Sequence, residues 1–252
     1  MQTTNRFRWI NQDELIPKED QPTFNSNAVE QYLHLIPGLT DRFIQMNDDY
    51  MLFGTVHPSV FFTEDKGIRL FLEGSAIKPH AFDSNSPPIW LGSTFHSVEM
   101  LQNAYGPIKT NEPRYLQHAP FVYYKQAFLN MHQRFYRSFR VASSHKFRHH
   151  GDVLTPLMHH GYVIQEGSHC CGMKYDIVPT DKIRKMMKFM RWTVDAEENN
   201  KHLQEIKQLA PIFFNVNDEM GSDATKAAAA QHQLKEAFVA LFGDAPGPFE
   251  LP

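Results

Sequence analysis

Two stretches of the sequence decide the fold that we expect: Arg42-Phe43-Ile44-Gln45-Met46, which runs into Asn47-Asp48-Asp49, and Pro211-Ile212-Phe213-Phe214-Asn215-Val216, which runs into Asn217-Asp218-Glu219. Each stretch is short, rich in apolar residues and bounded by polar ones, which is the pattern of a buried β-strand. In open α/β sheets, ligands bind outside the carboxyl ends of the strands. If the two strands are parallel neighbours, their acids and amides therefore converge on one small volume.

The side chains at these two strand ends have the chemistry of a hard-cation site. Mg²⁺ and Mn²⁺ take oxygen ligands, and Mg²⁺ is usually held by one or two carboxylates together with substrate phosphates and water. Aspartate after a strand is also common in turns, because its side chain hydrogen-bonds to nearby backbone. At this level both interpretations stay open.

The rest of the chain alternates between expected helices and strands. Helical patterns cover residues 28–36, 97–104, 121–139, 153–164 and 223–242, and residues 182–193 form a basic amphipathic segment. Asn27 and Glu30 have the spacing of a capping pair at the first helix, and Gly243 follows the last one. A hairpin is expected around residues 67–72. This alternation favours an α/β fold, and since no clear linker interrupts it, we expect one domain over residues 1–252.

A second group of candidate residues lies in the middle of the chain. His118 precedes a long helical pattern, and an imidazole ahead of a helix N-terminus can handle protons near an anion. Arg148 offers a planar fork for phosphate oxygens, and Asp152 can cap the next helix or orient a partner. The alternative is structural, because a chain with 14 histidines must place several of them at the surface or in the core.

Other classes of site have weak support. A zinc site built from His149, His150, His159 and His160 is disfavoured, because neither a separated cysteine pair nor zinc-protease spacing accompanies them. No glycine-rich loop matches a P-loop or a dinucleotide fingerprint, and no nucleophile-elbow serine is present.

Composition limits the possible partners and compartment. The formal net charge is −3, so neither nucleic acid nor an anionic membrane is an expected partner. The two cysteines, Cys170 and Cys171, are adjacent, and neighbouring cysteines rarely bridge each other, so we expect reduced thiols. No apolar run reaches the roughly 18 residues of a membrane span, and the first residues lack a signal-peptide pattern. The expectation is a cytoplasmic protein.

Three ordered blocks of sequence resemble the Stealth family. Pro22-Thr23-Phe24-Asn25-Ser26-Asn27-Ala28-Val29-Glu30, with His34, Pro37-Gly38-Leu39 and Asn47-Asp48-Asp49, is similar to its second block. His118-Ala119-Pro120 through Ser144-His145-Lys146-Phe147-Arg148 and Asp152 is similar to the third. Phe213 through Asn217-Asp218, followed by a helix and Pro248-Phe249-Glu250-Leu251, is similar to the fourth. The family includes bacterial capsular polysaccharide phosphotransferases and the α/β precursor of the lysosomal-enzyme N-acetylglucosamine-1-phosphotransferase.

The resemblance implies a reaction and a fold. The reaction is transfer of a sugar-1-phosphate, typically N-acetylglucosamine-1-phosphate, from a UDP-sugar to a hydroxyl of a glycan or polysaccharide, with release of UMP and with Mg²⁺ or Mn²⁺. The fold is a nucleotide-sugar-transferase-like, mostly parallel sheet flanked by helices.

Roles for single residues follow from the same resemblance. It makes His118 the general base, Arg148 a phosphate clamp, and Asp49 a catalytic residue at the metal or diphosphate. The implied metal ligands are Asp48, Asn217 and Asp218, and the implied substrate-binding residues are Asn27, Glu30, His34, Asn47 and Asp152.

The chain also departs from the family pattern. The family's first block, and an Arg- and aromatic-rich first half of the second block, are expected to be missing, since the similarity starts just before Pro22. A second histidine that often follows the one matching His118 is replaced by Phe121. Two other interpretations therefore stay open. One is an incomplete chain that binds a nucleotide sugar or glycan and needs a partner chain, and the other is a metal-dependent phosphoester hydrolase.

Overall fold

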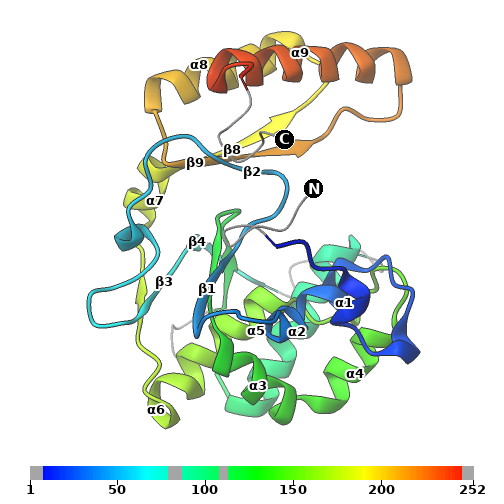
Figure 1. Cartoon of the computed structure of the whole chain (residues 1–252), viewed down its shortest axis with the longest axis vertical. Helices are drawn as coiled ribbons and strands as arrows, with labels where there is room; N and C mark the ends of the chain where they lie inside the picture. The colour runs from blue at the N-terminus through cyan, green and yellow to red at the C-terminus, as the bar shows by residue number, and fades with distance from the viewer. Residues whose placement is uncertain (1–7, 79–86, 108–112, 246–252) are drawn as a thin grey trace. The chain divides into compact units, whose positions relative to one another are not determined.

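A computed structural model describes residues 8–78, 87–107 and 113–245 of the chain (Figure 1). Contacts divide the chain into two compact units: unit 1 is Met1–Gln45 with Pro58–Thr180, and unit 2 is Met46–His57 with Asp181–Pro252. The single domain expected from the sequence stays a prediction. The block Pro248-Phe249-Glu250-Leu251 lies outside the described residues.

Unit 1 contains three short strand pairs. Strand β1 (Arg42–Gln45) pairs antiparallel with β6 (Phe121–Tyr124), so that Gln45 lies opposite Phe121. Strand β4 (Leu72–Ala76) pairs antiparallel with β5 (Arg114–Leu116), and β3 (Ile68–Leu70) pairs parallel with β7 (Tyr175–Ile177). The strands at the expected hairpin of residues 67–72 pair with distant strands, and the local antiparallel contact is a single bridge between Ile68 and Phe62.

Helices surround these strands and supply most of the core of unit 1. They are α1 (Ser26–Glu30), α2 (Ile89–Tyr105), α3 (Lys125–Arg134), α4 (Tyr136–Ser144), α5 (Thr155–Tyr162), a π-helical turn (Val163–Gly167) and α6 (Ser168–Cys170). Short 3₁₀ turns occur at Gln12–Glu14, Lys18–Asp20, Leu33–Leu35 and Pro58–Val60. Every residue of α5 is buried, because α2, α3 and β6 pack around it. The largest side chains of this core include Tyr123, Phe128, Phe139 and Tyr162.

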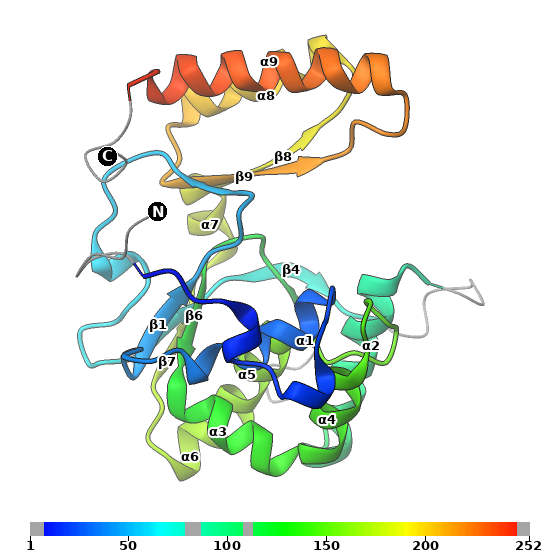
Figure 2. The same cartoon turned by 45° about the vertical axis from the view of Figure 1, so that its right-hand side comes forward.

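Unit 2 is a three-stranded sheet with two long helices. Strand β9 (Phe213–Asp218) lies between β2 (Tyr50–Leu52), which is antiparallel to it, and β8 (Met187–Trp192), which is parallel to it. Figures 1 and 2 show α8 (Ala196–Leu209) and α9 (Ala224–Phe242) side by side along this sheet. Trp192 is fully buried between sheet and helix, and its indole N–H donates to the carbonyl of Ala230 at 2.9 Å. A shorter helix, α7 (Thr180–Met186), precedes β8.

The expectation of an α/β fold is confirmed as a mixed α/β structure, but the mostly parallel sheet is wrong. Three of the five strand pairings among the described residues are antiparallel, and the strands form several small sheets. The two strands that we expected to be parallel neighbours, β1 and β9, belong to different sheets. β1 pairs with β6 because Phe121-Val122-Tyr123-Tyr124, which we assigned to a helix, has the β-branched and aromatic residues that favour a strand.

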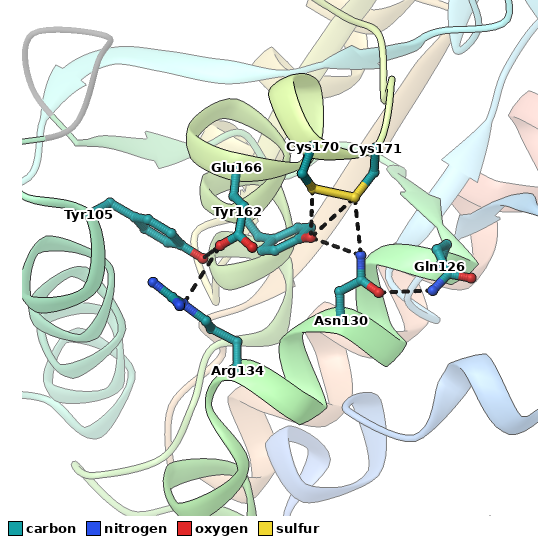
Figure 3. Close-up of a disulfide and its surroundings, with 8 residues drawn as sticks. All are labelled: Tyr105, Gln126, Asn130, Arg134, Tyr162, Glu166, Cys170 and Cys171. Atoms are coloured by element: carbon teal, nitrogen blue, oxygen red, sulfur yellow. Dashed lines mark hydrogen bonds and ion pairs between the residues drawn. A yellow bond between two sulfur atoms is a disulfide. The ribbon is translucent and has the colours of Figure 1, made fainter.

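The cysteine expectation is also corrected. Cys170 and Cys171 are joined by a disulfide rather than present as two thiols, as Figure 3 shows. The hydroxyl of Tyr162 lies 3.6 Å from the sulfur of Cys170, and the amide of Asn130 lies 3.6 Å from that of Cys171. On the membrane question, no helix among the described residues combines the length and hydropathy needed to span a bilayer.

Candidate functional site

Two loops of unit 1 that are far apart in the chain are bound to each other. The backbone N–H of Phe24 donates to the carbonyl of Lys146 at 2.8 Å, and the side chains of Thr23 and Asn25 both donate to the carbonyl of His145. Asn25 is also the N-cap of α1, where its side-chain oxygen accepts from the N–H of Asn27 at 3.1 Å. The start of α1 is therefore fixed against the loop that follows α4.

Asp152 is the centre of this contact. Its carboxylate is fully buried, and its Oδ2 accepts hydrogen bonds from the side-chain amides of Asn25 (2.9 Å) and Asn27 (3.2 Å) and from the backbone N–H of His149 (2.8 Å). Its Oδ1 lies 2.7 Å from Nδ1 of His145. Four donors replace the water that an exposed carboxylate would bind, and charge-assisted hydrogen bonds of this kind are strong. The arrangement gives both oxygens of a buried carboxylate hydrogen-bond partners.

The contact with Asp152 sets the orientation and the tautomer of the His145 ring. A carboxylate at Nδ1 keeps the proton on that nitrogen and leaves Nε2 as the atom that can exchange a proton or bind a ligand. The side chain of His145 is 24% exposed, and its ring lies 4.4 Å from that of His149. His145 is thus the exposed member of a histidine–carboxylate pair whose other member is buried.

A cation lies next to this pair, and an acid lies within electrostatic reach of that cation. Nε and Nη2 of Arg148 donate to the hydroxyl of Ser26 at 3.1 and 2.8 Å, so the guanidinium is oriented while most of the residue stays exposed. Burial raises the pKa of Glu30 to about 7, although the positive charge of Arg148 and a hydrogen bond from Gln45 act in the opposite direction. The side-chain oxygen of Gln45 accepts a hydrogen bond from the hydroxyl of Tyr123 at 2.9 Å, and its side-chain NH₂ group is left to donate to Glu30.

His118 is exposed in the turn between β5 and β6. The turn is closed by a hydrogen bond from the N–H of Ala119 to the carbonyl of Gln117 at 2.8 Å. Since Phe121 pairs with Gln45, this turn lies at the end of the β1–β6 pair where Gln45 contacts Glu30.

His34 occupies a different environment from the other expected substrate-binding residues. It is only 5% exposed, its ring lies against Phe128 and His132, and its Nδ1 is 3.1 Å from the carbonyl of Gln31. Burial lowers the pKa of His34 to about 4, with the neighbouring His132 acting in the same direction. His34 is therefore a neutral core residue at physiological pH, and its expected contact with substrate stays a prediction.

The residues expected at the metal all belong to unit 2. Asn47, Asp48 and Asp49 form the turn that precedes β2, and Asn217 and Asp218 end β9, so the antiparallel β2–β9 pair carries both groups at one end. The carbonyl of Asp49 accepts from the N–H of Val216 at 3.0 Å. Oδ1 of Asp218 accepts from the N–H of Met220 at 2.9 Å, and the amide of Asn217 donates to Glu219 at 3.0 Å, which is turn chemistry.

Two oxygens at this sheet end are candidates for a divalent-cation site. Oδ1 of Asp49 and Oδ1 of Asn215 are buried and have no hydrogen-bond partner among the described residues, while Nδ2 of Asn215 lies 3.5 Å from Oδ2 of Asp49. No group of three or more His, Cys, Asp or Glu side chains within residues 8–78, 87–107 and 113–245 is arranged to hold a metal. One carboxylate and an amide oxygen are nevertheless enough for Mg²⁺ when phosphates and water complete its shell.

Three residues of this site have no role among the sequence-based expectations. His145, Asn25 and Ser26 all lie inside the quoted family blocks, but only the fold shows that His145 and Asn25 meet at Asp152 and that Ser26 orients Arg148. A histidine seven residues before an aspartate is a weak signal in a chain with 14 histidines.

The geometry can be compared with known proteins. A family model described as "Stealth protein CR2, conserved region 2" matches residues 1–70, and a second model, "Stealth protein CR3, conserved region 3", matches residues 117–165. Both matches are to conserved regions of the Stealth family. The two regions contain the two loops that meet at Asp152, and the second-region match extends to the first residue of the chain.

The chain is similar to two kinds of curated polysaccharide phosphotransferase. It is 25% identical over 163 residues to the capsular polysaccharide phosphotransferase SacB of Neisseria meningitidis serogroup A, covering 64% of this chain and 29% of that protein. It is 28% identical over 246 residues to the exopolysaccharide phosphotransferase CpsY of Mycobacterium tuberculosis, covering 95% of this chain and 42% of that protein. The chain thus spans less than half the length of the curated relatives it matches.

Proposed function

We propose that this chain takes part in transferring a sugar-1-phosphate, with N-acetylglucosamine-1-phosphate as the first candidate, from a UDP-sugar to a hydroxyl of a polysaccharide. The observation that carries the proposal is the group formed by Asp152, His145, Arg148 and Glu30 where the two Stealth regions meet. The relatives named as capsular and exopolysaccharide phosphotransferases support the substrate class.

The transfer needs positioning and charge neutralisation more than covalent chemistry by the protein. The acceptor hydroxyl oxygen attacks the phosphorus that carries the sugar, the bond from that phosphorus to the oxygen of UMP breaks, and the acceptor proton leaves. We propose that His118 accepts the proton of the acceptor hydroxyl and that Arg148 binds the phosphate oxygens. Nε2 of His145, held in place by Asp152, contacts the same phosphate. Glu30, with its pKa near 7, can return a proton to the departing UMP.

A divalent ion would be held by Asp49 and Asn215 together with the expected ligands Asp48, Asn217 and Asp218. When bound, it would supply positive charge to phosphate oxygens. The carboxylate and amide oxygens suit Mg²⁺ or Mn²⁺.

The test is to incubate the purified chain with UDP-N-acetylglucosamine, Mg²⁺ and a set of oligosaccharide acceptors and to measure UMP. We expect UMP release that depends on the acceptor and falls by ~10²–10⁴-fold in His118→Ala, the usual contribution of a general base. Arg148→Lys should also reduce turnover, because lysine keeps the charge but loses the planar fork. Arg137→Lys, an exposed position on α4, is the matched control.

Two outcomes would contradict the proposal. Release of free sugar-1-phosphate without acceptor would favour a hydrolase. Binding of UDP-N-acetylglucosamine without any UMP release would favour a binding role without transfer.

A further inference from the structure

Two phenylalanines beside the candidate site are exposed and stacked on each other. Phe24 is 72% exposed and Phe147 is 69% exposed, yet their ring centroids are 5.5 Å apart and their planes differ by only 15°. Single exposed apolar residues are common on protein surfaces, but a parallel aromatic pair keeps a large apolar area in water, and such areas usually mark a binding surface.

The backbone holds this pair rigidly. The N–H of Phe24 donates to the carbonyl of Lys146, the residue before Phe147. Thr23 and Asn25, on either side of Phe24, are 2% and 0% exposed, and both donate to the carbonyl of His145. Phe24 therefore points outward from a segment whose neighbouring side chains point inward. Because these loops are already ordered, binding a ligand on the pair would carry little entropic cost from ordering them.

The pair is continuous with the candidate site. Phe24 is followed by Asn25 and Ser26, which contact Asp152 and Arg148. Phe147 is followed directly by Arg148. The two rings are thus attached to the same two loops that hold the phosphate-binding group.

We propose that the Phe24–Phe147 pair binds a sugar ring of the polysaccharide acceptor. The C–H groups on one face of a pyranose are weakly positive and apolar, and they match the negative face of an aromatic ring. A long polymer needs an open surface, since most of it stays outside the protein. A uracil base, like other small ligands, needs a concave pocket with placed polar groups, and two rings more than two-thirds exposed do not form one. This inference rests on the proposed function, because it names the acceptor site of that reaction.

The test compares binding of two probes by isothermal titration: a hexamer of N-acetylglucosamine for the acceptor, and UDP-N-acetylglucosamine for the donor. The variants are Phe24→Ala, Phe147→Ala and the double variant. We expect about a tenfold weaker hexamer affinity in the double variant, in line with the usual contribution of an aromatic contact, and an unchanged donor affinity. Phe147→Trp, which keeps an aromatic ring at this position, should retain hexamer binding. Tyr136→Ala is the control, since Tyr136 is 63% exposed on α4 of the same unit.

Several results would overturn the inference. The hexamer could fail to bind the wild-type chain, or it could bind the double variant as tightly as the wild-type chain. The double variant could also lose affinity for the donor rather than for the hexamer. A fall in thermal midpoint in the double variant that Tyr136→Ala does not show would assign the pair to folding instead.

Turnover separates this inference from the proposed function. If wild-type chain transfers sugar-1-phosphate but the double variant keeps its KM for the acceptor, the function stands and the aromatic site fails. If hexamer binding depends on the two rings while no UMP is released, the aromatic site stands and the function fails.

Discussion

Asp152 shows how one buried side chain joins distant parts of the sequence. Its four hydrogen bonds come from two asparagines at the start of α1 and from two residues of its own loop. A buried charge costs free energy unless it is fully hydrogen-bonded. Burial of the donors without the carboxylate, or of the carboxylate without the donors, would therefore be unfavourable. The same hydrogen bonds of Asp152 therefore determine both the stability of this contact and the orientation of His145.

Replacing Asp152 by alanine should destabilise the protein by ~3–5 kcal/mol, because three side-chain donors and a backbone N–H lose their shared acceptor. Urea unfolding measures the change. Asp176→Ala is the matched control: Asp176 is half exposed in an ion pair with Arg69, and its loss should cost no more than about 1 kcal/mol. Equal effects of the two substitutions would show that the buried network contributes little.

Two buried histidines predict a loss of stability in mild acid. Burial lowers the pKa of His34 to about 4 and of His160 to about 3, whereas both titrate near 6.5 in the unfolded chain. The unfolded state therefore binds more protons between these values, so the stability is complete above pH 6.5 and decreases as the pH falls toward 4 and 3.

The expected size is roughly 2 kcal/mol for each of the two imidazoles between pH 7.5 and pH 5. Urea unfolding at a series of pH values measures it. His232, whose side chain is 73% exposed, provides the control, and His232→Gln should leave the slope unchanged. Burial raises the pKa of Glu30 to about 7, which acts in the opposite direction over this range. A pH dependence that is unchanged in His34→Gln and in His160→Gln would therefore contradict the burial of the two rings.

At the scale of elements, local patterns were reliable for some segments and not for others. Residues 42–45, 213–218 and 224–242 form the strand, strand and helix that their sequences predict. The helix expected over 121–139 instead starts at Lys125, after strand β6, and ends at a break before Tyr136. The basic segment 182–193 divides into α7 and β8, and α8 was not predicted.

Helices α2 and α5 pack closely at Gly161. A Cβ atom placed on Gly161 would collide with the side chain of Leu101, so alanine there should destabilise the protein by ~1–3 kcal/mol. Intrinsic helix propensity alone predicts the opposite, a gain of about 1 kcal/mol. Thermal unfolding decides between them. Gly54→Ala, where nothing lies within 4 Å of the added atom, is the control. A stabilised Gly161→Ala variant would mean that the two helices separate at little cost.

At the scale of the whole molecule, contacts between distant segments build both units. Unit 2 forms when the short segment Met46–His57 adds strand β2 to β9, which lies more than 150 residues later. In the candidate cation site, Asp49 comes from one of these segments and Asn215 from the other. A bound ion would therefore stabilise the pairing itself.

Mg²⁺ should raise the thermal midpoint of the wild-type chain, because a ligand that binds only the folded state stabilises it. Asp49→Asn should abolish most of this shift, since it removes the only carboxylate of the buried oxygen pair. Asp223→Asn is the control, because it removes the same charge while keeping a side chain that can cap α9. An equal Mg²⁺-dependent shift in Asp49→Asn would rule out the proposed position of the ion.

The sequence by itself determined the Stealth relationship, the α/β class, the positions of β1, β9, α5 and α9, and Arg148 as a residue of interest. These features depend on residues that are neighbours along the chain, so periodicity and motif spacing report them directly. Only the tertiary structure decided that β1 pairs with β6 and that Asp152 holds His145. A strand's partner and a side chain's burial are set by segments far away in sequence. These segments compete for the same core and the same hydrogen bonds, and that competition leaves no pattern in the local sequence.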